Sequence, residues 1–252
     1  MITFGITGAI GHGKSTLAEA FGKVEPNSKH LESFTVIADV IDAWHAETTK
    51  IPNPHDLAEV NNWLTLLPSI LSQYVHEDID ASRLAFTMND IMANPGIYEK
   101  LFVHIQNIQK NPGLMSSRVT DLNKEYYRPM LQWLGGYLVT KVDPSIWYNE
   151  VMRMVQQAKA DGVALCTIGG VRYPKDAEIV RNGGGQIILI HRPMIGEQDM
   201  SDPTERERSH IKPDITIQND GGLAELVAVA QRIYADEKIG RVRSQYEAMN
   251  LT

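Results

Sequence analysis

The sequence predicts an α/β fold of three layers, in which a mainly parallel sheet of five strands lies between helices. Three observations predict it. The chain opens with an apolar run of strand length, Ile2–Thr7, which leads through a glycine-rich loop into a helix. After residue 124, strand-length apolar runs alternate with helical segments, an order typical of parallel sheets. Between these regions, residues 50–124 show only helical periodicity, which predicts an inserted helical lobe.

Each strand is expected where a short apolar run ends in glycines or polar residues. The five expected strands are Ile2–Thr7, Phe34–Ala38, Val163–Ile168, Gln186–His191 and Asp214–Gln218. Helical periodicity and start signals predict the main helices over residues 14–21, 39–47, 129–141, 144–160, 174–182 and 223–234. Pro129 is expected in the first turn of its helix. The polar tail after Lys238 is expected to fray or to extend the last helix.

The amino-acid composition excludes several classes of protein. Of the 252 residues, 43% are hydrophobic and 22% are charged, so the chain can bury a core and is not disordered. The net charge of −7 argues against a broad nucleic-acid or membrane surface. The N-terminus lacks the features of a signal peptide, and no apolar run reaches the ~18 residues of a membrane span. The single cysteine, Cys166, excludes a disulfide framework and is expected to be a small buried hydrophobe.

The strongest motif covers residues 8–15, Gly-Ala-Ile-Gly-His-Gly-Lys-Ser, and matches the phosphate-binding pattern G-x-x-x-x-G-K-[ST] in full. It follows a predicted strand and opens a predicted helix, the context that P-loop nucleotide-binding proteins require. Glycines let backbone N–H groups point at phosphate oxygens, and the helix N-terminus adds positive potential. Lys14 would reach the β- and γ-phosphates, and the Ser15 hydroxyl would ligate Mg²⁺. The residues expected to bind ATP are Gly8, Ala9, Gly11, His12, Gly13, Lys14, Ser15 and Thr16.

Other interpretations of this loop fit less well. A dinucleotide-binding fingerprint fails because Thr16 stands where its third glycine belongs. A glycine-rich turn with a surface lysine would be the plain alternative. The loop alone does not identify the reaction, because switches, motors and small-molecule kinases share it. The chain lacks the Asn-Lys-x-Asp guanine reader of switch GTPases.

Motifs in the C-terminal half carry a resemblance to a known family. In chain order they are Arg128-Pro129-Met130-Leu131-Gln132-Trp133-Leu134-Gly135, then Trp147, Val171–Glu178, His191-Arg192-Pro193 and Asn219-Asp220-Gly221. Together with the phosphate loop, they resemble the bacteriophage-type deoxynucleoside monophosphate kinases, which are P-loop NTPases. The resemblance covers the N-terminal loop and Tyr127–Tyr234, but not the helical lobe. It implies transfer of the γ-phosphoryl group of ATP, with Mg²⁺, to a deoxynucleoside 5′-monophosphate.

The implied reaction explains the arginines. Its nucleophile is a phosphate oxygen that is already ionised, so the site needs positive charge around two phosphates rather than a strong base. Arginine suits this role because its planar guanidinium binds phosphate through two hydrogen bonds. The resemblance implies Arg128, Arg172 and Arg192 as phosphate clamps, and Lys14, Arg172 and Arg192 as catalytic residues. Taken alone, each arginine could equally be a solvated surface residue.

Three further positions are candidate substrate contacts. Gln132, one helical turn before Gly135, could read the edge of the base, with the glycine leaving room for ligand, or could be an exposed helix residue. Trp147 could stack on the base, although it heads an apolar stripe and is more typical of a core. Asp39, which follows the second expected strand, could contact substrate or metal, or could cap the next helix.

Residues 193–212 resemble the mobile lid of the family, which closes over the phosphates and excludes water. Arg206 or Arg208 could enter the site on closure, although most charge runs are solvated. One position departs from the family, because Gly170 stands where an aspartate usually helps to hold Mg²⁺. Asp39 or Asp176 could compensate for it.

Two alternatives stay open at this point. The chain could phosphorylate another small metabolite, as a dephospho-coenzyme A kinase does, or it could be a nucleotide-binding regulator with weak catalysis. In the main interpretation, residues 1–252 form one kinase domain with a helical insertion over 50–124. It would bind a deoxynucleoside monophosphate but neither nucleic acid nor membrane, and the resemblance suggests a homodimer. We expect it in the cytoplasm, which would be that of the host if a phage encodes it. The preferred base is not identified.

Overall fold

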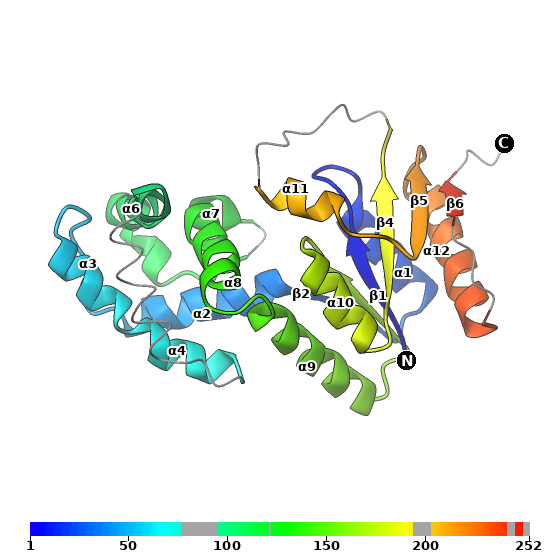
Figure 1. Cartoon of the computed structure of the whole chain (residues 1–252), viewed down its shortest axis with the longest axis horizontal. Coiled ribbons are helices and arrows are strands. Elements are labelled where there is room, and N and C mark those ends of the chain that lie inside the picture. The colour runs from blue at the N-terminus through cyan, green and yellow to red at the C-terminus, as the bar shows by residue number, and fades with distance from the viewer. Residues whose placement is uncertain (77–94, 121, 194–202, 241–244, 249–252) are drawn as a thin grey trace. The chain divides into compact units, whose positions relative to one another are not determined.

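The computed structural model describes residues 1–76, 95–120, 122–193, 203–240 and 245–248. The chain divides into two compact units (Figure 1). The first comprises Met1–Ser33 with Val151–Thr252, and the second comprises Phe34–Glu150. The second unit is therefore longer at both ends than the insertion expected at 50–124.

The first unit is built on a parallel sheet whose six described strands lie in the order β2-β3-β1-β4-β5-β6. Each strand runs parallel to its neighbours, which confirms the expected α/β fold. The carboxyl ends of parallel strands meet at one edge of the sheet, where α/β proteins bind ligands. The strands are β1 (Ile2–Thr7), β2 (Ser28–Glu32), β3 (Leu165–Gly169), β4 (Gln186–His191), β5 (Ile215–Asn219) and β6 (Gln245–Ala248).

Two parts of this sheet correct the expectations from sequence. The second strand is β2, whereas the apolar run Phe34–Ala38 lies in helix α2 (Ser33–Glu47). The prediction was wrong because a short apolar run can be a buried helix segment as well as a strand. The tail after Lys238 does not extend helix α12 (Leu223–Lys238). It adds β6 beside β5, and this sixth strand was not expected.

Helices cover both faces of the sheet (Figure 1). On one face, α1 (Lys14–Val24) and α12 share one hydrophobic core with β1, β4 and β5, built on side chains such as Phe4, Phe21 and Ile188. On the other face lies α10 (Pro174–Asn182), whose Val180 packs near Gly5 of β1. The remaining helices of this unit are α11 (Pro203–Ser209) and most of α9 (Ile146–Ala160), within which the division falls.

Cys166 is buried in β3, as expected, and forms no disulfide. Burial raises the pKa of its thiol to about 11, because the thiolate would lose its hydration. The thiol is therefore protonated at neutral pH and acts as a small packing group.

The second unit is helical throughout its described residues. Three prolines of this region stand at helix starts: Pro68 in the first turn of α4, Pro95 at the first residue of α6 and Pro112 at the start of η1. Pro129, expected in a first turn, instead lies inside α7, because that helix begins earlier, at Lys124. Residues 77–94, part of the expected helical lobe, lie outside the described residues. The elements are α2, α3 (Leu57–Leu64), α4 (Leu67–Tyr74), α6 (Pro95–Lys110), a 3₁₀ turn η1 (Pro112–Met115), α7 (Lys124–Gln132), a π-helical turn η2 (Trp133–Tyr137), α8 (Leu138–Lys141) and the start of α9. None of the described helices is long and apolar enough to cross a membrane.

Aromatic rings fill the core of the second unit. The rings of Trp44 and Trp63 stack with centroids 4.4 Å apart. Beside them His45 and His104 are buried, and their Nε2 atoms lie 3.1 Å apart. One Nε2–H must donate to the other nitrogen, so the ring that accepts must be neutral. Burial accordingly lowers the pKa of His45 to about 4 and that of His104 to about 3.

The histidine pair predicts that the second unit loses stability in acid. Both pKa values lie below the ordinary 6.5, so the unfolded chain binds more protons at pH values from 6.5 down to about 3. The free energy of unfolding should fall as the pH drops through this range, by at most about 1.4 kcal/mol per pH unit for each ring. All four tryptophans lie in this unit, so tryptophan fluorescence during urea unfolding measures its stability.

The matched control is the double variant His45→Leu/His104→Leu, which removes the titrating groups and should flatten the dependence between pH 4 and 6.5. Equal slopes for wild type and double variant would show that the pair does not titrate as its burial indicates.

Candidate active site

The phosphate loop joins β1 to α1 at the carboxyl edge of the sheet. Gly11 and Gly13 turn this loop with φ angles of +81° and +101°, a conformation that side chains disfavour. Helix α1 then begins at Lys14 with no side-chain cap and no acidic residue in its first turn. An uncapped helix start presents backbone N–H groups and the positive end of the helix dipole. The loop therefore fits a phosphate group.

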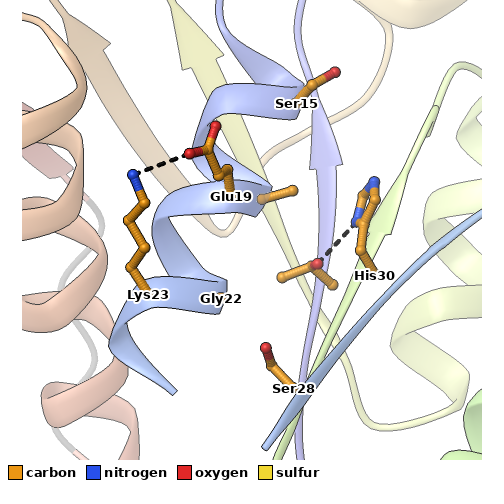
Figure 2. Close-up of a pocket in the computed structure, with 8 residues that line it drawn as sticks. Ser15, Glu19, Gly22, Lys23, Ser28 and His30 are labelled. Carbon is orange, nitrogen blue, oxygen red and sulfur yellow. Dashed lines mark hydrogen bonds and ion pairs between the residues drawn. The ribbon is translucent and has the colours of Figure 1, made fainter. Parts of the chain in front are cut away.

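Lys14 lies folded across the loop. Its Nζ donates to the carbonyl oxygens of Gly8 and Ala9, at 2.6 and 2.8 Å. Ser15 follows it on the first turn of α1, is exposed, and is one of the residues that line a cavity beside this helix (Figure 2). No cluster of three or more His, Cys, Asp or Glu side chains in the described part of the chain could hold a metal ion. Among the loop residues, the Ser15 hydroxyl is an oxygen that could ligate a cation together with oxygens of the ligand.

His12 fastens the loop to the ends of two other strands. Asn219, the last residue of β5, donates from Nδ2 to the His12 carbonyl oxygen at 2.9 Å. The backbone N–H of Arg192, just after β4, donates to Nδ1 of the His12 ring at 3.4 Å. Nδ1 accepts in this contact, so the ring that makes the bond is neutral. Asn219, the first residue of the Asn-Asp-Gly motif, thus holds the phosphate loop through this hydrogen bond.

The loop lies in a positive field. The pKa of His12 is lowered, mainly by burial and further by the charges of His191, Arg208 and Lys14. Arg208 lies on α11, in the segment expected to be the lid, so the charge of this arginine acts on the loop. Arg206 is exposed on the same helix, and residues 194–202 of the expected lid lie outside the described residues.

The loop after β3 is held by Asp176. Its Oδ2 accepts the backbone N–H groups of Arg172 and Tyr173 at 3.0 and 2.9 Å, at the start of α10. The carboxyl group is 2% exposed, and burial raises its pKa to about 7. Because Asp176 is buried against these backbone groups, it is not placed to compensate for Gly170 at a metal, as the sequence had suggested. It positions Arg172, whose side chain is exposed.

Asp39 lies inside α2, neither after a strand nor at a helix start, so both structural premises of its expected roles were wrong. Burial raises the pKa of Asp39, and the nearby charge of Arg118 lowers it. Asp42, one turn further along α2, has a raised pKa for the same reason and accepts the N–H of Val119. No sequence pattern predicts that the charge of Arg118 acts on these two carboxyl groups. A substrate contact by Asp39 stays a prediction.

Arg128 is exposed on α7, where its guanidinium makes two hydrogen bonds to the carboxylate of Glu125. An exposed ion pair of this kind contributes only about 0–1 kcal/mol, so a phosphate group can displace the carboxylate. Gln132 ends α7 and is exposed. Both positions are therefore accessible for the roles implied by the family resemblance.

Gly135 and Trp147 are explained by packing. A Cβ at Gly135 would lie 3.2 Å from Cδ1 of Ile37, so this glycine lets η2 approach α2 rather than leaving room for a ligand. Trp147 is 2% exposed and donates from Nε1 to the carbonyl oxygen of Leu134 at 3.2 Å. A base-stacking role for Trp147 is contradicted by this burial, which agrees with the core alternative.

The parallel core and the glycine-rich loop before α1 are consistent with the class of P-loop NTPase kinases. Within that class, the family model for deoxynucleotide monophosphate kinase matches residues 73–229. The match covers more than half of the chain, and the chain belongs to this family. Its members transfer a phosphoryl group to a deoxynucleoside monophosphate, which confirms the expected kinase activity. A search of curated proteins finds no match. The phosphate loop lies outside the matched range.

The two hydrogen bonds that Asp176 accepts predict that its alanine and asparagine variants differ in their free energy of unfolding. Asp176→Ala removes the acceptor of two N–H groups at a helix start and should lower the free energy of unfolding by about 1–2 kcal/mol. Asp176→Asn keeps an acceptor oxygen and should retain most of it. Since the folded pKa of about 7 exceeds the ordinary 3.8, the contribution of Asp176 to the stability of the first unit should decline as the pH rises from about 4 to 7, opposite in sign to the contribution of the histidine pair to the second unit. Urea unfolding followed by circular dichroism should show a flatter dependence for the asparagine variant. An asparagine variant with the wild-type slope would contradict the assignment.

Proposed function

We propose that the chain transfers the γ-phosphoryl group of ATP to a deoxynucleoside 5′-monophosphate, giving ADP and a deoxynucleoside diphosphate. The family supplies the acceptor class. The donor rests on one observation, the uncapped phosphate loop that is fastened to the ends of β4 and β5. A triphosphate suits this loop because backbone N–H groups and several positive side chains converge on it.

On the donor side, the loop backbone binds the β- and γ-phosphates. Lys14 exchanges the carbonyl oxygens of Gly8 and Ala9 for phosphate oxygens, which are stronger acceptors because they are charged. Arg192 and Arg208 add positive charge around the γ-phosphoryl group, where negative charge develops in the transition state. The Ser15 hydroxyl would hold Mg²⁺, which would neutralise phosphate charge when bound.

On the acceptor side, the monophosphate needs no base, and the protein's task is to overcome repulsion between two anions and to hold them in line. Arg172 serves as a clamp whose backbone Asp176 fixes. Arg128, released from Glu125, binds the acceptor phosphate, and Gln132 reads the edge of the base. Clamps on both phosphates would make ATP hydrolysis slow without an acceptor, because water cannot replace the contacts of the monophosphate.

The proposal predicts ADP release that depends on a deoxynucleotide. Mg-ATP is offered with dTMP, dGMP, dCMP, dAMP or dUMP separately, and ADP is measured by a coupled assay. At least one acceptor should raise the rate well above the rate of ATP hydrolysis alone. Lys14→Ala should abolish this increase, because the variant cannot neutralise the transferring phosphoryl group.

Lys23→Ala is the matched control, since Lys23 also lies on α1 but pairs with Glu19 at the surface. It should keep the wild-type rate. ATP binding with no response to any of the five acceptors would exclude this function.

We expect His12 to affect the rate of phosphoryl transfer because its ring holds the backbone of Arg192 in place. His12→Leu removes the acceptor of the Arg192 N–H and should lower kcat by about tenfold, whereas His12→Asn offers an oxygen in place of Nδ1 and should recover much of the loss. In an Arg192→Ala background, His12→Leu should have little further effect, because the guanidinium side chain that this backbone bond positions is already absent. Steady-state kinetics of the four variants and the wild type measure this coupling. Fully additive losses would show that His12 acts on the loop alone.

A further inference from the structure

The phosphate loop carries a large apolar side chain at its corner. Ile10 stands between Ala9, which is 1% exposed, and Gly11, and Ile10 itself is 73% exposed. The backbone N–H of His12 donates to the carbonyl oxygen of Ala9 at 3.2 Å, which closes a turn over residues 9–12. Gly11 supplies the positive φ of +81° that a type II turn requires at its third residue. The turn therefore holds Ile10 at its corner, with the side chain exposed to solvent.

This corner lies beside the ammonium group of Lys14. Nζ of Lys14 donates to the carbonyl oxygen of Ala9 at 2.8 Å, so the turn and the lysine share one acceptor. In a trans peptide the carbonyl oxygen and the next Cα lie on the same side of the C–N bond, about 3 Å apart. Cα of Ile10 is therefore within about 6 Å of Nζ of Lys14. Ile10 projects from the loop at the place where Lys14 would meet a phosphate group.

An apolar side chain contrasts with the rest of this loop. Lys14 and Arg208 contribute to a positive field there, which suits charged and strongly hydrated groups. A single exposed isoleucine elsewhere, such as Ile239 at 67% exposure, needs no explanation. Ile10 differs because it lies inside the loop that would bind the transferring group, and side chains that break a local pattern are expected at functional sites. What isoleucine contributes there is the lack of any hydrogen-bonding group.

Water is the competing nucleophile that a kinase must reject. In hydrolysis a water oxygen attacks the γ-phosphorus, the bond to the bridging oxygen of ADP breaks, and inorganic phosphate and a proton are released. Enzymes that carry out this reaction orient the water with a hydrogen-bonding side chain, such as a glutamine. Ile10 offers no such group, and water placed against it would lose hydrogen bonds. A monophosphate acceptor does not depend on this position, because charged side chains would hold its phosphate.

We propose that Ile10 is a specificity-determining residue that shields the γ-phosphoryl group from water, so that transfer goes to the deoxynucleotide rather than to solvent. It does so by denying a water nucleophile any hydrogen-bonding partner beside Lys14. The side chain cannot easily swing away, because the turn is closed by His12 and His12 is itself fastened to the ends of β4 and β5. The inference rests on the proposed function, since it assumes that the loop binds ATP with the γ-phosphate at Lys14.

The test measures how the transferred group is divided between two acceptors. The full chain is given Mg-ATP and a saturating concentration of a deoxynucleotide that it phosphorylates, and the ratio of inorganic phosphate to deoxynucleoside diphosphate is determined. Ile10→Ala should raise this ratio about tenfold, and Ile10→Gln should raise it further because its amide can orient water. Ile10→Val keeps an apolar, branched side chain and should retain the wild-type ratio. A merely structural loss would lower both products together and leave the ratio unchanged.

Ile239→Ala is the matched control, because Ile239 is also an exposed isoleucine but follows α12 at the end that is remote from β5. It should keep the wild-type ratio. An unchanged ratio in both Ile10→Ala and Ile10→Gln would overturn the inference while leaving the proposed function standing. A higher KM for the deoxynucleotide at an unchanged ratio would assign Ile10 to acceptor binding and overturn it as well. A wild-type protein that forms no diphosphate with any deoxynucleotide would instead refute the proposed function.

Discussion

The phosphate loop is held by hydrogen bonds from the ends of two strands other than its own. The amide of Asn219 binds the carbonyl oxygen of His12, and the N–H of Arg192 binds its ring. A loop with three glycines has many conformations to lose, so fixing its middle residue matters for its shape. These bonds exist because β4 and β5 run parallel to β1 and end at the same edge. The sheet topology therefore determines both where the loop lies and which residues surround it.

The positive field at this loop has two consequences that support each other. The whole chain has a net charge of −7, yet Lys14 and Arg208 both act on His12. Positive charge at this point suits a triphosphate. Burial lowers the pKa of His12, and this positive charge lowers it further, which favours the neutral ring whose Nδ1 can accept from Arg192. A protonated ring could not make that bond. The charges that suit the ligand thus keep the loop fastened to β4.

Sequence reasoning found the elements whose signals are local. The phosphate loop, the parallel strands around it and the Asn219 motif depend on short patterns, and the structure agrees with them. It failed at β2, because that strand lies at the edge of the sheet and carries polar residues such as Ser28 and His30 instead of an apolar run. The error also misplaced Asp39. Tryptophans are ambiguous for a different reason. A tryptophan that stacks on a base and a buried core tryptophan such as Trp147 can occur in the same local sequence pattern.

The contacts that complete the site could not be predicted, because they join residues far apart in the chain. Asp176 fixes Arg172 through a backbone N–H group, which nearly every residue has. The residue type at position 172 therefore does not indicate the interaction. The bonds of Asn219 and Arg192 to His12 form only because β1, β4 and β5 end at one edge of the sheet.

The same geometry explains why position 170 is a glycine. Val171 is fixed to β1 by a hydrogen bond from the Thr7 hydroxyl to its carbonyl oxygen, at 2.8 Å. The chain reaches that position through the left-handed turn at Gly170, where a side chain would be strained.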